Sequence, residues 1–431
     1  MRVLMFGWEF PPHIAGGLGT ACEGIVKGLA YNGVESIFVM PSASGDEDQS
    51  ATRIINASDV AVENFTGTVD EFLDKVKFIH IDSNLVPYAD PEEFSRMVED
   101  ERARQLKDFR ITYGQKYKFS GKYGSNLLEE VARYAMVGGT IAMQHKDEFD
   151  IIHAHDWLTY LAGIAAKELT GKPLVVHVHA TSFDRGTDDM VDSRVFAIEK
   201  RGMEAADCVV TVSDLTRNIV INKYGIDPAK VVTVHNAVDF SGRENMEVER
   251  GVRDKVVTFL GRITFQKGPE YFIEAAAKVL KRTRGVRFVM AGSGDMMNRS
   301  IKMVARMGIS DRFHFTGFLR GADVQKMFAL SDVYIMPSVS EPFGISPLEA
   351  MRTGVPSIIS HQSGAAEVLK YALKVDFWDV DAMADDIYAL LNYPALSHFA
   401  AVQGYDEVNE LKWNNATAKL KKVYESVLNR Q

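Results

Sequence analysis

Short apolar runs alternate with longer helical patterns along the chain, and this alternation limits the fold more than any other feature. β-Branched and apolar runs separated by helix-length segments are typical of parallel α/β sheets. The runs expected as strands are Arg2–Phe6, Ser36–Met40, Lys77–Ile81, Ile151–Ala154, Leu174–Val178, Cys208–Val212, Val231–Val234, Val256–Leu260, Arg287–Ala291, Phe313–Thr316, Val333–Met336 and Ser357–Ile359.

A polar, charged stretch, Asp239–Lys255, interrupts the alternation once. A chain of 431 residues is too long for one compact core, so two domains are expected. The predicted division is an amino-terminal α/β domain at 1–240, a linker at 241–255, a second α/β domain at 256–400 and a mostly helical segment at 401–431.

Composition excludes several classes of protein. Apolar residues make up 46% and charged residues 25% of the chain, as in soluble globular proteins. The net charge of −9 argues against nucleic acid or an anionic membrane surface as a partner. The first residues predict a buried strand, not a signal peptide, and no run has the length of a transmembrane helix, so a cytoplasmic protein is expected. The two cysteines lie far apart and predict neither a disulfide nor a zinc framework.

The most informative segment runs from Glu341 to Glu349, directly after the apolar run Val333–Met336. It places two carboxylates across a strand-to-helix turn, and each has acceptor oxygens that suit vicinal hydroxyls. A sugar at Glu341 and a ribose at Glu349 fit this pattern. The structural alternative is a capping box from Ser346 to Glu349, with Pro347 at the first helical position. That alternative explains Glu349 alone.

Two cations follow the expected strand Val256–Leu260, in the pattern Gly261-Arg262-x4-Lys267-Gly268. Ligands of α/β proteins usually bind at the carboxyl ends of the strands. If the leaving group is a nucleoside diphosphate, Arg262 and Lys267 would stabilise the negative charge that grows as the bond to the sugar breaks. The alternative is a surface arginine and a lysine at a helix start.

A glycine-rich turn with Gly16, Gly17 and Gly19 follows the first expected strand. Such a turn lets backbone amides approach a phosphate, and it also occurs in dinucleotide-binding oxidoreductases. Here Cys22 replaces the third glycine of that pattern. The second strand ends at Met40 without the ribose-binding acid that usually follows. A nicotinamide cofactor is therefore disfavoured.

Two His-x-His pairs, His153 with His155 and His177 with His179, fall at strand period. Each pair therefore faces one side of a sheet and permits metal binding. The simpler interpretation is that His153 and His177 are buried and hydrogen-bonded. His155 and His179, with the adjacent Asp156, lie at or beyond strand ends and are expected to line a cleft.

The segment Pro87–Gly124 is rich in charge and in aromatic residues. It fits either a solvated helix and loop at the domain edge or a wall for a sugar acceptor. The aromatic residues concerned are Phe109, Tyr113, Tyr117, Phe119 and Tyr123.

In their order along the chain, these motifs resemble those of retaining glycosyltransferases with the GT-B fold, in particular glycogen and starch synthases and related group 1 families. The matching motifs are the Gly-Gly-Leu loop at 16–18, HAHDW at 153–157, VHVH at 176–179, a VHN-x-VD hinge at 234–239, GR-x4-KG at 261–268, AGSGD at 291–295 and Glu-x7-Glu at 341–349. The resemblance implies two Rossmann-like domains that face a deep cleft, with a last helix that crosses back to the first domain.

The resemblance also implies roles for individual residues. Arg262 and Lys267 would hold the donor diphosphate, Glu341 the hydroxyls of the donor sugar, and His179 the transferred sugar. Further donor contacts are expected from Gly16, Gly17, Phe318, Leu319, Phe343, Gly344, Ile345 and Glu349, and acceptor contacts from Asp156 and Trp157. No metal or other cofactor is expected, since the cations take the place of a metal.

The reaction implied is the transfer of a hexosyl unit, most simply glucose, from UDP- or ADP-glucose to an α-1,4-glucan. Ile14 stands where ADP-glucose-dependent synthases have a lysine, so UDP- or GDP-sugars are comparably good donors. The alternatives are transfer to a lipid-linked or cell-surface glycan, and a nucleotide-sugar epimerase on the same fold.

Overall fold

The computed structural model describes residues 1–13, 16–63, 67–68, 110–111, 114–121, 126–185, 191–238, 248–251 and 253–430. The chain forms two compact units. The first unit consists of Met1–Phe183, Asp188–His235 and Trp413–Gln431, and the second of Asp184–Thr187 and Asn236–Lys412. The predicted strand Lys77–Ile81 and most of the predicted linker lie outside the described residues.

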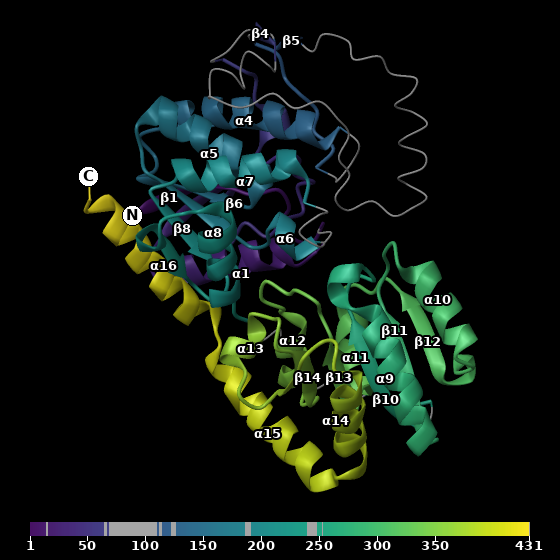
Figure 1. Cartoon of the computed structure of the whole chain (residues 1–431). Coiled ribbons are helices and arrows are strands. Elements are labelled where there is room, and N and C mark those ends of the chain that lie inside the picture. The colour runs from purple at the N-terminus through teal and green to yellow at the C-terminus, as the bar shows by residue number, and fades with distance from the viewer. Residues whose placement is uncertain are drawn as a thin grey trace. The chain divides into compact units, whose positions relative to one another are not determined.

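The first unit is built on a seven-stranded parallel sheet with the order β3-β2-β1-β6-β7-β8-β9. Figure 1 labels β1, β6 and β8 of this sheet. Its strands are β1 (Arg2–Phe6), β2 (Glu35–Met40), β3 (Arg53–Asn56), β6 (Ile151–His155), β7 (Leu174–Val178), β8 (Cys208–Thr211) and β9 (Val231–Thr233). A separate antiparallel pair joins β4 (Gly67–Thr68) to β5 (Arg110–Ile111).

Helices cover both faces of this sheet. They are α1 (Gly17–Tyr31), α4 (Leu127–Gln144), α5 (Trp157–Thr170), α6 (Ser182–Arg185), α7 (Ser193–Ala205), α8 (Asp214–Tyr224) and α16 (Trp413–Leu428), with short 3₁₀ turns η1 (Ala57–Asp59) and η3 (Pro228–Lys230). Strand alternation directs Leu4, Ile152 and Val176 into the core formed with α4, α5 and α7. The residues that alternate with these along the strands, including His153, point to the opposite face of the sheet, toward α1 and α16.

The second unit contains a six-stranded parallel sheet with the order β12-β11-β10-β13-β14-β15. Its elements are β10 (Lys255–Leu260), η4 (Phe265–Lys267), α9 (Pro269–Arg282), β11 (Val286–Ala291), α10 (Met297–Arg306), η5 (Ser310–Arg312), β12 (Phe313–Gly317), α11 (Ala322–Leu330), β13 (Val333–Met336), α12 (Ser346–Arg352), β14 (Ser357–Ser360), α13 (Ala365–Val368), β15 (Leu373–Val375), α14 (Val380–Asn392) and α15 (Pro394–Glu410). The prediction of two parallel α/β domains is confirmed. The predicted cleft between them stays a prediction.

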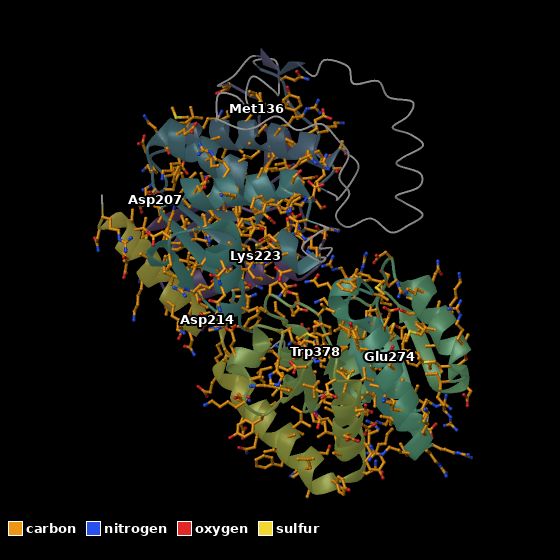
Figure 2. The ribbon with its side chains drawn as sticks, in the orientation of Figure 1. Met136, Asp207, Asp214, Lys223, Glu274 and Trp378 are labelled. Atoms are coloured by element: carbon orange, nitrogen blue, oxygen red, sulfur yellow. The ribbon has the colours of Figure 1, made fainter. Side chains whose placement is uncertain are left out.

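Side-chain caps fix where several helices begin. Asp192, Ser213 and Asp379 precede α7, α8 and α14, and each accepts a hydrogen bond from an amide in the first turn of its helix. These caps satisfy donors that have no partner inside the helix. Asp207, labelled in Figure 2, directly precedes β8 and does not cap a helix. Its carboxylate accepts a hydrogen bond at 2.7 Å from the amide of Leu174, the first residue of β7, and so links the starts of these two strands.

The last helix, α16, packs on α1 within the first unit. Gly28 of α1 has no side chain, and a Cβ there would lie 2.6 Å from Thr417 Oγ1 and 2.8 Å from the carbonyl oxygen of Trp413. Asn32 donates from Nδ2 to Thr417 Oγ1 at 3.0 Å, and Lys421 donates to the carbonyl of Asn32 at 2.9 Å. The packing of α16 on α1 therefore depends on the close approach of the two helix backbones as well as on hydrogen bonds.

The return to the first unit begins later than the predicted segment 401–431. Residues up to Lys412 belong to the second unit, where Gly404 of α15 packs on Met351 of α12. The chain crosses back at Trp413.

We expect Gly28→Ala to destabilise the first unit. Alanine gains about 1 kcal/mol of helix propensity over glycine. Its Cβ, however, would collide with a backbone carbonyl, and such overpacking typically costs 1–3 kcal/mol. Thermal unfolding should show a lower midpoint, by about 2–4 °C. Gly285→Ala is the matched control, because a Cβ at Gly285 meets nothing within 4 Å. Equal midpoints for Gly28→Ala and the wild type would contradict the packing argument.

Candidate functional site

In each sheet the strand order reverses between two neighbouring strands, at β1 and β6 in the first unit and at β10 and β13 in the second. Ligands of open parallel sheets bind beyond the carboxyl ends of the strands at such a point. The segment Gly261–Gly268 follows β10, and the segment Glu341–Glu349 follows β13. The topology of the second unit therefore brings these two predicted motifs together.

Lys267 and Glu341 form an ion pair between Nζ and Oε2. Their side chains are only 19% and 9% exposed, so the pair is largely removed from water. The Ser338 hydroxyl donates to the same carboxylate oxygen at 3.2 Å. The predicted diphosphate-binding lysine and the predicted sugar-binding carboxylate are thus in direct contact.

Backbone hydrogen bonds hold Glu341 from both sides. Its amide donates to the carbonyl of Gln362 at 2.9 Å, and its own carbonyl accepts from the amide of Gly364 at 2.9 Å. The loop after β14 therefore fixes this carboxylate. Sequence reasoning did not find Gln362 or Gly364, because they act through backbone atoms, which carry no side-chain signature. It also missed Ser338, whose hydroxyl contacts the carboxylate.

Close backbone contact fixes the loop that carries the two cations. Gly268 has a φ of +66° and lies against the carbonyl of Pro337, where a Cβ would overlap the backbone. Gly292, from the AGSGD motif, approaches the carbonyl of Gly261 in the same way. The amide of Ile263 donates to the carbonyl of Ser293 at 2.8 Å. Glycine is required where two main chains meet this closely.

Arg262 is half-buried beside this loop. Its Nη2 lies 3.4 Å from Oε1 of the buried Gln266, and the carbonyl of Gln266 accepts from the amide of Val339. The β10 and β13 segments are therefore linked around both predicted cations.

Glu349 lies in the first turn of α12 and is half-buried. Burial raises the pKa of its carboxyl, and the nearby Arg352 opposes this shift. The capping-box alternative is wrong: Ser346 is the first helical residue, and no side chain caps the helix.

The other predicted donor residues differ in exposure. The Phe343 side chain is buried, with 2% exposed, so any ligand contact would come from its backbone. Gly344 turns the chain with a φ of +92°. Ile345 is half-buried, and Leu319 packs on a small apolar cluster under α11. Phe318, just after β12, is 50% exposed, and the Arg320 guanidinium lies 5.1 Å from its ring centroid. An exposed aromatic face at a carboxyl edge can stack on a base.

In the first unit, Gly16 and Gly17 are exposed at the start of α1, and a Cβ on either would meet nothing within 4 Å. Ile14 lies outside the described residues. The buried Glu9 accepts a hydrogen bond at 3.2 Å from the amide of Gly19. One of the free amide donors in the first turn of α1 therefore already has a partner. Glu9 was missed by sequence reasoning, although an acid between apolar residues just after β1 is a signal.

Asp156 links the ends of β6 and β7. Its Oδ1 accepts from the amides of His179 at 2.7 Å and Ala180 at 3.3 Å. Asp156 has a φ of +59°, which is uncommon for a residue other than glycine and is often associated with functional sites. Its observed role is to position His179, whereas the predicted acceptor contact stays a prediction.

Two predictions for the acceptor side need correction. Trp157 is only 1% exposed and belongs to the core, so its ring is not placed to contact an acceptor. Tyr117 and Phe119 are also buried in that core. They therefore do not form a sugar-binding wall. Lys116 and Lys118 beside them are exposed, which fits the alternative of a solvated loop packed on the domain edge. Phe109, Tyr113 and Tyr123 lie outside the described residues.

The histidine pairs form one stack across β6 and β7, since the parallel register sets His155 beside His177. Ring centroids lie 4.2 Å apart for His153 and His155, and 4.3 Å apart for His177 and His179. His153 Nδ1 is 2.7 Å from the Tyr424 hydroxyl, which confirms a hydrogen-bonded His153. Neither ring nitrogen of His177 has a partner within the described part of the chain, so the prediction of a hydrogen-bonded His177 is wrong. His155 is fully buried, contrary to its predicted place at a cleft.

Burial dominates the acid–base properties of this stack. It lowers the pKa of His153 and of His179 to about 3, and the pKa values of His155 and His177 also lie well below the ordinary value. These imidazoles are therefore neutral at pH 7. Burial, with help from the charges of Glu9 and Asp156, raises the pKa of Cys22.

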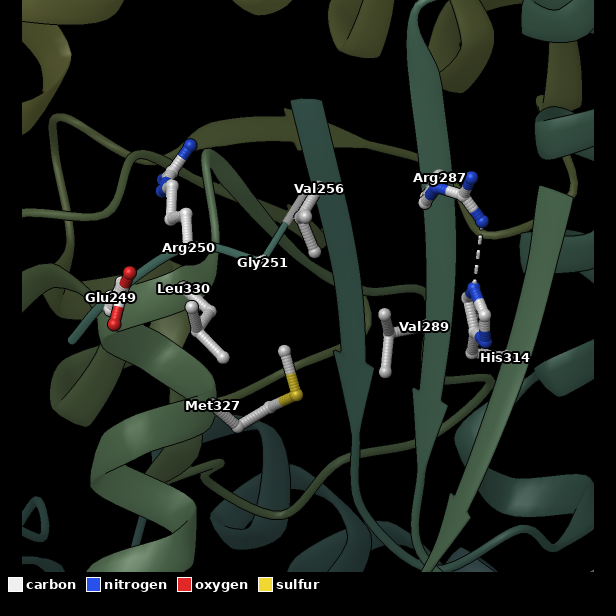
Figure 3. Close-up of a pocket in the computed structure, with 9 residues that line it drawn as sticks. All are labelled: Glu249, Arg250, Gly251, Val256, Arg287, Val289, His314, Met327 and Leu330. Carbon is white, nitrogen blue, oxygen red and sulfur yellow. Dashed lines mark hydrogen bonds between the residues drawn. The ribbon is translucent and has the colours of Figure 1, made fainter. Parts of the chain in front are cut away.

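One pocket of about 210 Å³ lies elsewhere in the second unit (Figure 3). It is lined by Val256, Arg287, His314 and Met327, among others, and the Arg287 side chain contacts His314 at 3.1 Å. Val256, Arg287 and His314 stand near the amino ends of their strands. The pocket contains none of the predicted site residues and faces away from the edge where such folds bind ligands.

No helix in the described part of the chain is both long and apolar enough to cross a membrane.

Comparisons with known proteins agree with this architecture. A family model described as glycosyl transferases group 1 matches residues 243–405, and one described as glycosyltransferase family 4 matches residues 102–241. The chain is 27% identical over 442 residues to an uncharacterised glycosyltransferase of Methanocaldococcus jannaschii, and the alignment covers 98% of each of the two proteins. It is 22% identical over 432 residues to a glycogen synthase of Mycobacterium tuberculosis, which covers 98% of this chain and 94% of that protein. The crystal structure of Anabaena HepE in complex with UDP and glucose has a TM-score of 0.65 at 15% identity, covering 99% of this chain and 100% of that chain.

Two Rossmann-like parallel-sheet units of this kind define the fold as GT-B. The two family matches together cover more than half of the sequence. The chain belongs to the group 1 glycosyltransferases.

The histidine stack predicts loss of stability in acid. The pKa of His153 falls from 6.5 to about 3 on folding, so the unfolded chain binds more protons between these values. The contribution of these neutral histidines to the free energy of unfolding is therefore fully present above about pH 6.5. It declines as the pH falls toward 3, by up to about 1.4 kcal/mol per pH unit for each such group. Urea unfolding midpoints at pH 7.5, 6 and 5 should fall in that order. His153→Gln should reduce the slope and exposed His398→Gln should not; a slope that His153→Gln leaves unchanged would contradict the assignment.

Proposed function

We propose that this enzyme is a retaining glycosyltransferase that moves a glucosyl unit from a nucleoside diphosphate sugar to an α-1,4-glucan. The observation that carries the proposal is the convergence of Arg262, Lys267 and Glu341 beyond β10 and β13. Two cations beside a sugar-binding carboxylate suit a substrate with an anionic leaving group and a polyhydroxylated reacting group.

The second unit would bind the donor. Its diphosphate would lie at Arg262 and Lys267, its sugar hydroxyls at Glu341, and its ribose at Glu349. The Lys267–Glu341 contact supports this arrangement, because the lysine neutralises a nearly buried carboxylate. A bound diphosphate would then interact with the Lys267 ammonium group together with the Glu341 carboxylate. The exposed ring of Phe318 would stack on the base, with Leu319 beneath the loop.

The reaction would proceed on one face of the sugar. The bond from the anomeric carbon to the diphosphate oxygen breaks, and a bond from an acceptor oxygen forms on the same side. The diphosphate takes the acceptor proton. Arg262 and Lys267 stabilise the charge that grows on the departing oxygen, so they favour the transition state over the ground state. The roles assigned to these groups need no metal ion.

The first unit would hold the reacting sugar and the acceptor. His179 would contact the transferred sugar as a neutral imidazole, since burial lowers its pKa to about 3. Asp156 would act through the His179 backbone that it positions. Gly16 and Gly17 would approach the phosphates without steric hindrance.

The relatives support the choice of substrates. The Mycobacterium tuberculosis relative is named as a glycogen synthase, which favours a glucan acceptor. HepE was crystallised with UDP and glucose, and Ile14 replaces the lysine of the ADP-glucose pattern. We therefore place UDP-glucose before ADP-glucose as donor.

A donor panel tests this proposal directly. UDP-, ADP- and GDP-glucose are each incubated with and without glycogen, and nucleotide release, glucan length and the anomeric configuration of the product are measured. Glycogen-dependent release from UDP- or ADP-glucose, with growth of α-linked chains, is expected. A β-linked product would contradict retention. Donor turnover that never extends glycogen would contradict the glucan acceptor and favour a lipid-linked one.

The Lys267–Glu341 pair makes a second prediction. Lys267→Ala should reduce kcat/KM at least tenfold, and Glu341→Gln should do the same. Lys267→Ala should also destabilise the second unit by about 1–3 kcal/mol, because it leaves a nearly buried carboxylate without its cation. Lys267→Ala combined with Glu341→Gln should recover stability but not activity, as kinetics and thermal unfolding would show.

Lys278→Ala is the matched control for that pair. Lys278 pairs with Asp381 on the surface, where both side chains are well exposed, and such pairs contribute little. Wild-type activity in Lys267→Ala would remove this lysine from the proposed site.

A further inference from the structure

Cys22, His155 and His179 bring a thiol sulfur and two imidazole nitrogens within 4.8 Å of one another. The residues come from α1, from the last position of β6 and from the turn after β7. The parallel register sets His155 beside His177, so His179, two residues further on, projects from the same face. The cluster is a product of the fold, since its members lie far apart in the sequence.

The cluster leaves polar atoms without partners. Cys22 and His155 have no exposed surface, and His179 is half-buried. His155 Nδ1 lies 3.0 Å from His179 Nε2. The other ring nitrogens, His155 Nε2 and His179 Nδ1, have no hydrogen-bond partner anywhere in the described ranges. A buried polar atom without a partner is costly and calls for an explanation.

One thiolate and two imidazoles are the ligands that Zn²⁺ prefers, and sites with three protein ligands keep a fourth position open. The charges of Glu9 and Asp156 act on Cys22, so the surroundings are negative and favour a cation. We propose that Cys22, His155 and His179 bind one divalent cation of the zinc type, with the fourth position left for water or another small ligand. On binding, the thiol releases its proton to solvent and the sulfur binds as thiolate.

The neighbouring residues suit this assignment. His179 is the most exposed of the three and provides a route of entry. Asp156 fixes the His179 backbone through two hydrogen bonds, which restricts where its ring can point. Tyr424 of α16 holds His153, whose ring lies against that of His155 with the centroids 4.2 Å apart. Groups that hold metal ligands in place strengthen metal binding.

Metal binding would have a consequence for transfer, and this consequence rests on the proposed function. His179 is the ring proposed to contact the transferred sugar. A ring nitrogen bound to a metal has no lone pair left for a sugar hydroxyl. The bound cation would therefore oppose productive sugar binding.

Cobalt absorption tests the site without any turnover assay. The full-length, chelator-treated protein is titrated with Co²⁺ under reducing conditions, and the visible and near-ultraviolet spectra are recorded. One equivalent should bind and give tetrahedral cobalt bands with a thiolate-to-cobalt charge-transfer band, and Zn²⁺ should displace it. Cys22→Ser should abolish the charge-transfer band. Cys208→Ser should leave it intact, because Cys208 is also a free, buried cysteine but stands on β8, outside the cluster.

A second variant keeps the test decisive if Cys22→Ser does not fold. His179→Gln alters a half-buried residue and should weaken Co²⁺ binding at least about tenfold, with circular dichroism showing a folded protein. Absence of the charge-transfer band in the folded wild type would overturn the proposal, and so would a band that survives in folded Cys22→Ser. Because spectra alone decide, failure of the metal site is distinguishable from failure of the proposed transferase function.

Discussion

The arrangement at the carboxyl edge of the second sheet depends on close packing of main chain against main chain. Gly268 lies against Pro337, and Gly292 lies against Gly261, at distances that exclude a Cβ. These contacts hold the loop after β10 beside the loop after β13, and Lys267 consequently meets Glu341. The charged pair is therefore a result of backbone fit, which explains why glycines surround it.

Sequence reasoning predicted most of the parallel framework because buried central strands are continuous apolar runs. It missed β3 and β15, which are edge strands of four and three residues. The segments Arg53-Ile-Ile-Asn56 and Leu373-Lys-Val375 are too short and too polar to differ from loops. It selected Lys267 from the rule that ligands gather at strand ends, and Glu341 as a carboxylate at a strand-to-helix turn that suits vicinal hydroxyls. Their direct contact depends on side-chain conformation, on which the sequence carries no information.

The first unit shows a different limit of prediction. Two His-x-His pairs are visible in the sequence, but their mutual distance depends on which strands are neighbours and in what register. Only the pairing of His155 with His177 merges them into one stack, and only the position of α1 adds Cys22. Trp157 illustrates the same point, because a residue directly after a strand end looks accessible in sequence and is buried by packing.

The course of the chain has a consequence for folding during synthesis. Residues 1–235 supply the whole sheet of the first unit, yet α16, which covers Gly28 and hydrogen-bonds His153, is encoded after the entire second unit. A nascent chain therefore lacks the cover of this face of α1 and the hydrogen-bond partner of His153 while the intervening domain emerges from the ribosome. Domains generally fold in order of synthesis, so the amino-terminal domain must wait, incompletely covered, for the last helix. This interval is when chaperones would be needed.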